Sequence, residues 1–333
     1  MEVQGKMIIQ AKKLSKTYKL FEKEAGLRGS IKSLFNRKYI YKTALSDFDL
    51  EVNEREFVGL IGPNGAGKTT LIKLLTGIIA PTSGELSVLG YYPNNLEYAF
   101  KKQYAVVMGQ KSQLFSELSA ADTFLLFKEL YGIPTDEYQR NLDYFVKLFD
   151  VEKLLNVQVR TLSLGERMKM ELIVALLHNP RVLFLDEPTI GLDAVAQKQI
   201  RMFLREVNKT RGTTIILTSH YMEDIKSLCK RCVVVNRGEK IYDGSTDALF
   251  EKYQTHKKIS LSFSEATDFV LPQGCTLVDQ NPQKCTFMVP VEASREVVYS
   301  LIQQYNLRDI TIEEDDIGSV VERIYSDRQV KRT

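Results

Sequence analysis

The feature that most constrains this chain is a glycine-rich segment between an apolar run and a helical pattern. The segment contains Gly62, Pro63, Asn64, Gly65, Ala66, Gly67, Lys68, Thr69 and Thr70. Strand, loop and helix in this order are the context of a G-x-x-x-x-G-K-[ST] phosphate-binding loop. Glycines let successive backbone N–H groups point at a phosphate, and the helix N-terminus adds its dipole. We expect Lys68 to contact the β- and γ-phosphates and Thr69 to ligate Mg²⁺.

An acidic pair follows a second apolar run farther along the chain. Asp186 and Glu187 come directly after residues 183–185, which read as a buried strand. A carboxylate at such a strand end is suited to the Mg²⁺ shell, which we assign to Asp186. Glu187 is then placed to orient water, or to accept its proton, for attack on the γ-phosphate. An acidic strand end at the surface is the alternative, and the upstream loop favours the catalytic interpretation.

Four more residues suggest contacts with a nucleotide. His220 follows the apolar run 214–217, at the edge of an α/β sheet where ligands bind, and we expect it to bond the γ-phosphate. Ser163 and Gly165 precede a helical run, which is an anion-binding arrangement. Because the chain already has one phosphate loop, this second one suggests a site shared between two chains. Tyr18 either stacks on a base or belongs to the core.

Composition limits the class of protein. The 333 residues suggest one large domain with a smaller one, and 44% hydrophobic residues suit a globular core. A net charge of +3 is too small to indicate nucleic acid, and none is expected as a partner. There is no run of eighteen apolar residues, so any membrane role is expected to come through a partner.

The pattern of residues divides the chain into parts. A main α/β domain is expected over 1–256, with a helical part over about 94–165, and a small β/α module over 257–333. Segment 19–43 is rich in basic residues, and Leu27, Ile31, Leu34 and Phe35 fall on one helical face. It is either a basic amphipathic helix for a membrane surface or partner, or a surface hairpin.

The order of these motifs closely resembles the ATPase subunit of ATP-binding cassette (ABC) transporters over about residues 6–250. The motifs are Tyr18, residues 62–70, Gln110, residues 163–166, Asp186 with Glu187, Asp193 and His220. The resemblance implies a P-loop NTPase core of ABC type within the α/β class, a helical subdomain and a small C-terminal α+β module. It also implies that ATP and Mg²⁺ are the ligands.

The resemblance adds roles that the spacing of residues does not give. Tyr18 resembles the aromatic residue that stacks on adenine, and Gln110 the glutamine that links Mg²⁺ and water to the helical subdomain. Asp193 resembles the loop that crosses the dimer interface, and His220 the switch histidine. The segment 163–166 resembles the signature Leu-Ser-Gly-Gly-Gln, but Leu164 replaces its first glycine and Glu166 its glutamine.

The resemblance also implies partners and a direction of transport. The partners are a second ATPase subunit, identical or different, and membrane permease subunits at the cytoplasmic face of the cell membrane. Residues 109–114 and 185–193 look most like the drug- and ion-extrusion exporters, whereas the insertion 19–43 also occurs in polysaccharide exporters. A soluble ATPase without a membrane partner, or a nearly inactive regulatory one, remains as an alternative.

Overall fold

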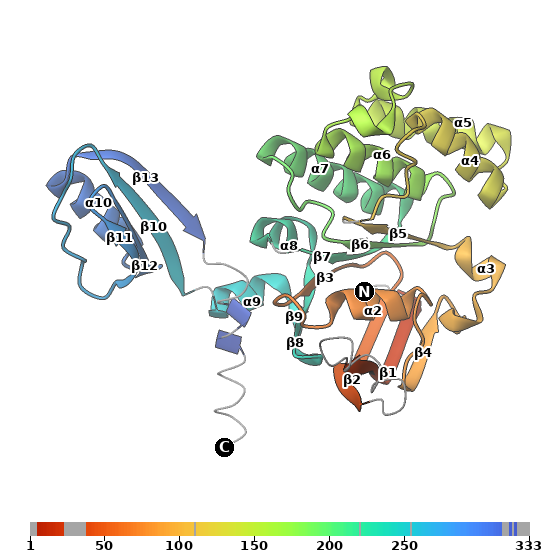
Figure 1. Ribbon diagram of the computed structural model, residues 1–333, viewed down its shortest axis with the longest axis horizontal. Helices are drawn as coiled ribbons and strands as arrows, with labels where there is room; N and C mark the ends of the chain where they lie inside the picture. Colours follow the sequence, from red (N-terminus) through yellow and green to blue (C-terminus); the bar gives the residue numbers. More distant parts are fainter. Residues whose placement is uncertain are drawn as a thin grey trace, which may run out of the picture. The chain divides into compact units, whose positions relative to one another are not determined.

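The computed structural model describes most of the chain, namely residues 5–22, 38–109, 111–219, 221–253, 255–314, 320–321 and 323–324. The chain divides into two compact units, Met1–Asp243 and Gly244–Thr333 (Figure 1). In the first unit strands and helices alternate along the chain, as the predicted α/β class requires.

A six-stranded sheet is the centre of the first unit, in the order β5-β6-β7-β3-β8-β9. Its strands are β3 (Phe57–Ile61), β5 (Tyr104–Met108), β6 (Val182–Asp186), β7 (Thr214–Thr218), β8 (Arg231–Asn236) and β9 (Glu239–Ser245). Neighbouring strands in the series β5, β6, β7, β3 and β8 pair in parallel. The apolar runs of β3, β6 and β7 are buried. Parallel pairing brings the carboxyl ends of β3, β6 and β7 to one edge of the sheet.

Helices cover both faces of this sheet. On one face lie α6 (Leu164–Leu176), α7 (Ala194–Arg211) and α8 (Met222–Leu228), with α4 (Ala120–Tyr131) and α5 (Thr135–Phe149) outside them (Figure 1). On the other face, α2 (Lys68–Leu75) lies between the sheet and a second, antiparallel sheet. The apolar side chains of α2 join strands of both sheets in one core. The helix that follows the glycine-rich loop is therefore held from two sides.

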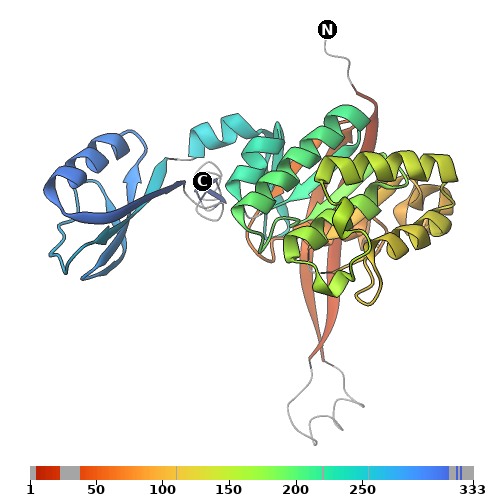
Figure 2. The same ribbon diagram turned by 90° about the horizontal axis from the view of Figure 1, so that it is seen from above.

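The antiparallel sheet contains β1 (Met7–Glu22), β2 (Lys38–Asn53) and β4 (Ser83–Val88), in the order β2-β1-β4. Strands β1 and β2 extend beyond the rest of the first unit as the arms of a hairpin (Figure 2). Lys19 pairs with Tyr41 there, so residues 19–22 and 38–43 of the basic segment belong to these two strands. The four apolar residues of the predicted helical face lie outside the described residues.

The predicted helical part of the chain contains one strand that the sequence pattern did not reveal. Besides α4 and α5 it holds α3 (Tyr98–Lys101) and the 3₁₀ turns η1 (Pro93–Asn95), η2 (Glu152–Leu154) and η3 (Val159–Thr161). Residues 104–108, however, form β5 at the edge of the central sheet, where only alternate residues are fully buried. This strand has the same length as β3, β6 and β7, but it lies within residues 94–165, where the helical spacing of other segments led us to expect helices. Among the described residues, no helix is both long and apolar enough to cross a membrane.

The described part of the second unit contains a four-stranded antiparallel sheet, in the order β11-β12-β10-β13, and the helices α9 and α10. These elements are α9 (Thr246–Tyr253), β10 (His256–Phe263), β11 (Thr276–Asn281), β12 (Lys284–Pro290), α10 (Ser294–Gln304) and β13 (Leu307–Glu314). Ile259, Leu261 and Phe263 alternate into its core, as their spacing predicts. The unit begins before the expected boundary at 256 because α9 belongs to it, and Arg323 Nε donates to Tyr253 O at 2.8 Å.

A half-buried histidine just after α6 makes the stability of the first unit depend on pH. The His178 ring stacks on Tyr131 with centroids 4.0 Å apart, and its Nε2 lies 3.1 Å from Tyr104 O. Burial lowers the pKa of His178 to about 4. The unfolded chain binds this proton nearer its ordinary pKa of about 6.5, so acid favours unfolding as the pH falls from there toward 4.

We expect His178→Phe to remove this contribution. The loss of unfolding free energy between pH 7 and about pH 4.5 should shrink by about 2 kcal/mol relative to the wild type, measured by urea denaturation at both pH values. His256→Gln, a change at the histidine that begins β10, should leave the pH dependence as it is. An unchanged pH dependence in His178→Phe would show that other groups cause it.

Candidate active site

The glycine-rich segment forms the loop between β3 and α2. Close packing requires a glycine at its start, because a Cβ on Gly62 would lie 2.1 Å from Val235 O. The loop turns through a hydrogen bond from Ala66 N to Pro63 O at 3.1 Å, and its middle residues are exposed, namely Pro63, Asn64 and Gly65. Gly67, with φ 114°, immediately precedes α2. The predicted order of strand, loop and helix is thus present.

Lys68, Thr69 and Thr70 form the first turn of α2. The Lys68 side chain is 5% exposed, and its Nζ donates to Gly62 O at 2.6 Å and to Pro63 O at 3.1 Å. Burial lowers the pKa of this ammonium, while the carboxylates of Glu187 and Asp186 act in the opposite direction. A buried cation held over a loop of backbone N–H groups is suited to bind the phosphates of a nucleotide.

Asp186, the last residue of β6, joins three elements through its carboxylate. Its Oδ2 accepts from Thr69 Oγ1 and its Oδ1 from Thr218 Oγ1, both at 2.7 Å. Thr69 belongs to α2 and Thr218 ends β7 beside β6, where the two strands pair Asp186 with Thr218. The structure therefore brings together two of the three residues predicted for Mg²⁺, and the third, Gln110, lies outside the described residues. Thr218 was not predicted, although its place at the end of the neighbouring strand is the pattern that would have found it.

Glu187 begins the turn after β6 with φ 56°, a left-handed conformation that residues other than glycine seldom adopt. Its backbone N–H donates to the carbonyl oxygen and to the hydroxyl of Thr218, each at 3.1 Å. Its half-buried carboxylate acts on the pKa of Lys68, so the two charges lie within electrostatic reach of each other. Such a carboxylate, within electrostatic reach of a cation, is suited to orient or deprotonate water.

A second buried carboxylate, Asp224 of α8, fixes the chain around this edge of the sheet. It accepts from Thr189 Oγ1 at 2.5 Å and from Ser219 Oγ at 2.7 Å, and Arg201 Nη1 donates to it at 2.9 Å. Thr189 follows Glu187 closely and Ser219 follows Thr218, so both turns leaving the sheet are anchored on one group. The sequence does not predict this network, because Arg201 in α7 and Asp224 in α8 belong to no recognisable motif.

The predicted signature segment begins α6 with a capping box. Ser163 is the N-cap, and Glu166 N donates to Ser163 Oγ at 3.3 Å. In return, Glu166 Oε2 accepts from Ser163 N and from Ser163 Oγ, both at 2.8 Å, and these bonds lower the pKa of Glu166. The acidic residue that replaces the consensus glutamine therefore completes the helix cap, as either residue type does at this position.

Asp193 is the N-cap of α7, and its Oδ1 accepts from Ala196 N at 2.8 Å. The two helix starts pack together, because a Cβ on Gly165 would lie 2.9 Å from Ala196 Cβ. A Cβ on Gly191 would likewise lie 3.2 Å from Leu164 Cδ2. The two segments predicted to face a second subunit are thus neighbours, and they form a group separate from the Lys68–Thr69–Asp186 cluster.

The remaining predicted residues are less defined. Tyr18 is half-buried in β1 opposite Lys42, and Lys16 Nζ lies 5.3 Å from the centre of its ring. Gln110 and His220 lie outside the described residues. The roles of these three residues remain predictions.

Comparison with known proteins agrees with this fold. The chain matches the ABC transporter family over residues 45–190. The ABC transporter ATP-binding protein NatA of Bacillus subtilis is 31% identical over 65% of this chain and 87% of its own length. The Nod factor export ATP-binding protein I of Rhizobium etli is 33% identical, over 65% of this chain and 68% of its own length. The linearmycin resistance ATP-binding protein LnrL of Bacillus subtilis is 30% identical, over 68% and 73%.

Solved structures agree on the fold. The structure of an ATP-binding subunit of an ABC transporter has a TM-score of 0.61 at 27% identity, covering 74% of this chain and 93% of that one. The cbiO1 structure from Clostridium perfringens, part of the ABC transporter complex cbiONQ, has a TM-score of 0.60 at 24% identity, covering 74% and 92%. The chain therefore belongs to the ABC transporter family, as an ATP-binding subunit. It is an ATPase with the P-loop core that the sequence predicted.

Gly109 connects the chain after β5 to the catalytic turn, and this contact can be tested. Its N–H donates to Asp186 O at 2.9 Å, and a Cβ on it would lie 2.5 Å from Glu187 O. We expect Gly109→Ala to displace the backbone of Glu187 and to lower ATP turnover by roughly tenfold or more, measured as phosphate release. Gly5→Ala is the control, because a Cβ there meets no atom closer than 3.3 Å. Wild-type turnover in Gly109→Ala would show that this approach does not control Glu187.

Proposed function

We propose that the chain powers an exporter by binding ATP with Mg²⁺ in the Lys68–Thr69–Asp186 cluster. One observation carries the proposal: the Thr69 hydroxyl bonds the Asp186 carboxylate at 2.7 Å, beside the buried ammonium of Lys68. Export is supported by the names of two relatives, which refer to Nod factor export and to linearmycin resistance. The residues 109–114 and 185–193, which resemble extrusion exporters, support the same direction.

The residues of the cluster fit a magnesium ion. A hydroxyl and a carboxylate are hard oxygen donors, and Mg²⁺ usually takes one or two protein carboxylates and completes its shell with water and substrate phosphates. The described residues contain no group of three or more His, Cys, Asp or Glu side chains that would hold a metal without such help. Thr69 and Asp186 would hold the ion. When bound, it neutralises charge on the phosphates.

The remaining residues of the site then have distinct roles. Lys68 binds the β- and γ-phosphates, and Glu187 holds the attacking water and receives its proton. Gln110 and His220 complete the surroundings of the γ-phosphate, and Tyr18 stacks on the adenine. Because Thr218 holds both the carboxylate of Asp186 and the backbone of Glu187, it keeps the metal ligand and the base in one geometry.

A second ATPase subunit, identical or different, completes the site. Ser163 and Gly165 of one subunit face the γ-phosphate bound by Lys68 of the other, and Asp193 lies at the interface beside them. ATP then contacts both subunits only in the closed dimer, so its higher affinity for that state drives closure. Hydrolysis removes the bridging phosphate and the dimer opens. This motion acts on membrane permease subunits at the cytoplasmic face of the membrane.

Glu187→Gln separates nucleotide binding from hydrolysis. We expect the variant to bind ATP with wild-type affinity and to lose a factor of about 10²–10⁴ in turnover, the usual contribution of a general base. Phosphate release and equilibrium binding of ATP measure the two effects. Glu129→Gln, the same change at an exposed residue of α4, should leave both at wild-type values. Hydrolysis by Glu187→Gln at the wild-type rate would remove Glu187 from the mechanism.

The partner is tested with the same variant. Tagged Glu187→Gln protein, purified from detergent-solubilised membranes with ATP and Mg²⁺, should retain a membrane protein with several spanning helices in stoichiometric amount, identified by mass spectrometry. Its identity would also separate a drug or ion exporter from a polysaccharide exporter. Recovery of ribosomes or DNA, or of the protein alone, would contradict a transporter and support a soluble ATPase.

A further inference from the structure

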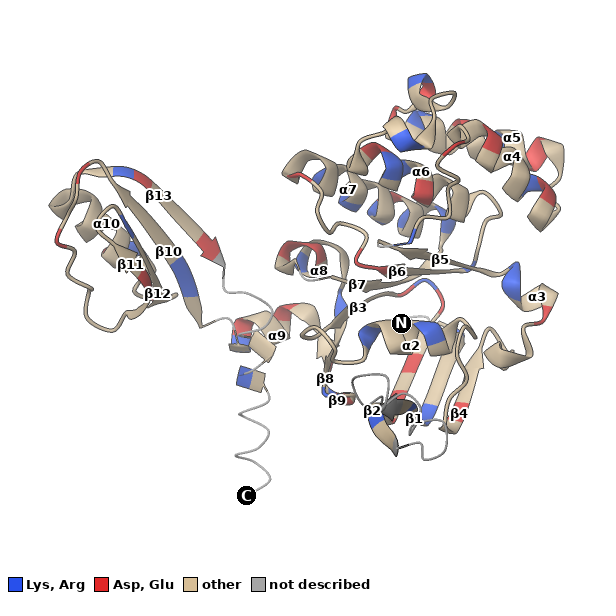
Figure 3. Cartoon of the chain, viewed as in Figure 1, with Lys and Arg blue, Asp and Glu red and all other residues tan. Residues whose placement is uncertain are grey.

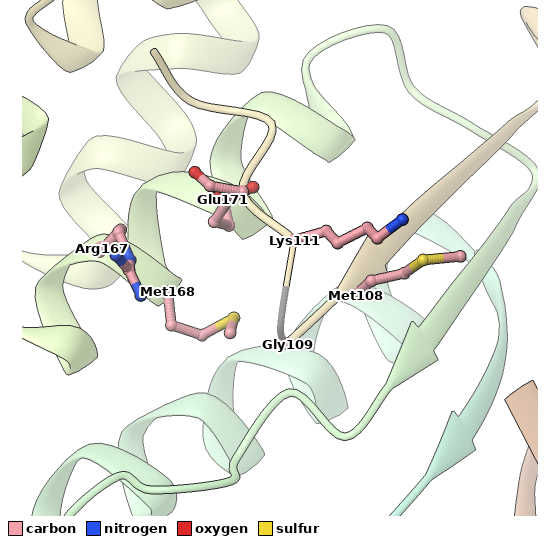
Figure 4. Close-up of a pocket in the computed structure, with 7 residues that line it drawn as sticks. Met108, Gly109, Lys111, Arg167, Met168 and Glu171 are labelled. Carbon is pink, nitrogen blue, oxygen red and sulfur yellow. The ribbon is translucent and has the colours of Figure 1, made fainter. Parts of the chain in front are cut away.

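A buried carboxylate on α6 binds the chain that follows Gly109. Glu171 is 4% exposed, and its Oε1 accepts from the Ser112 hydroxyl. The same carboxylate accepts from Gln113 N at 3.0 and 3.1 Å, and from Leu114 N at 3.5 Å. In Figure 4, Glu171 lies on its helix beside the chain that runs on from Lys111. Residues 112–114 are thus attached to α6 through a single side chain.

The same stretch of chain is attached at its other end to the catalytic turn. Gly109 bonds Asp186 O and packs against Glu187 O, as described above. A tight turn follows, in which Lys111 N donates to Met108 O at 2.9 Å. Gly109 therefore contacts the end of β6, while residues 112–114 are bound to the middle of α6, and Gly109, Lys111 and Ser112 line a cavity of about 130 Å³.

Holding this contact with the buried carboxylate of Glu171 costs desolvation free energy. Burial raises the pKa of Glu171, and the hydrogen bonds from Ser112, Gln113 and Leu114 act against that rise. The cation that acts on it is Arg167, one turn earlier on α6. A buried charge of this kind seldom stabilises a protein more than a well-packed apolar side chain would. Its contribution here is therefore to fix one geometry. Here it fixes the register of residues 112–114 on the helix.

Helix α6 carries this anchor and the signature segment on one rigid body. Ser163 is the N-cap and Glu171 lies about two turns farther on, roughly 12 Å along the axis. A movement of residues 112–114 relative to β6 is therefore transmitted to Ser163 and Gly165. In the proposed dimer those two residues face the nucleotide of the other subunit. Gly109, by contrast, lies against Glu187, the proposed general base of its own subunit.

We propose that Glu171 is a positioning residue that couples the two ATP sites of the dimer. It attaches the chain after Gly109 to α6. Gly109 moves with the catalytic turn of its own subunit, whereas the N-terminus of α6 faces the other subunit. The inference rests on the proposed function, because it needs a second subunit opposite Ser163. It adds a residue of α6 that touches neither the phosphate loop nor the catalytic carboxylates in the hydrogen bonds described.

The coupling is tested with Glu171→Gln and Ser112→Ala, which weaken the contact from its two sides. Both should lower kcat for ATP by roughly tenfold and leave KM within about twofold, since the Lys68 loop is unchanged. The double variant should lose little more than either single one, because both act on one contact. Ser112→Ala changes one hydroxyl on the loop side, so it also serves if Glu171→Gln does not fold.

Asn141→Ala is the matched control. Asn141 is also 4% exposed, and its Nδ2 donates to Leu177 O at the far end of α6, at 2.8 Å. It should lower thermal stability without changing the ratio of kcat to KM. If Asn141→Ala lowers kcat as much as Glu171→Gln does, or if Glu171→Gln keeps the wild-type kcat, Glu171 is only a structural anchor and the inference is wrong.

A second measurement separates this inference from the proposed function. In the Glu187→Gln background, ATP with Mg²⁺ should give a dimer in size-exclusion chromatography. Adding Glu171→Gln should shift the chain to the monomer, whereas adding Asn141→Ala should not. A monomer already in Glu187→Gln alone would overturn the proposed dimer, and with it the coupling. A dimer that forms equally well with Glu171→Gln would overturn the coupling alone.

Discussion

The site depends on one carboxylate that accepts hydrogen bonds from two threonine hydroxyls. Asp186 holds Thr69 at the start of α2 and Thr218 at the end of β7, so the glycine-rich loop, the helix that follows it and the neighbouring strand share one fixed point. Each hydroxyl bond to an ionised group is stronger than a neutral hydrogen bond. The position of Glu187 follows from the same point, because its backbone is bonded to Thr218. The buried Lys68 then faces a set of charges whose geometry is already determined.

Much of the fold and part of the site were predictable because the deciding patterns are local. The loop 62–67, the buried strands β3, β6 and β7, and helix α4 each carry a complete pattern within a few residues. Strand β5 was missed because it lies within the stretch 94–165, where the helical spacing of neighbouring segments led us to expect helices. Thr218, Asp224 and Glu171 were missed for another reason: their importance arises from tertiary contacts, and no spacing along the chain marks them.

The signature segment shows how a departure from a consensus is understood once the contacts are known. In the sequence, Glu166 only adds negative charge to a segment expected to face a nucleotide. In the structure its carboxylate is directed back to Ser163, where it caps the first turn of α6. Leu164 packs next to Gly191 and so joins this turn to the loop before α7. Both substitutions are thereby part of how α6 begins.

The pairing of Asp186 with Thr218 has a consequence for how the protein becomes active. Side chains alternate between the two faces of a strand, so a slip of one residue between β6 and β7 would turn the threonine hydroxyl away from the carboxylate. Residues 57–61, 182–186 and 214–218 lie far apart in the chain and must all pair before the site exists. A chain whose central strands are incompletely or wrongly paired therefore lacks a working hydrolytic centre, even with an intact glycine loop.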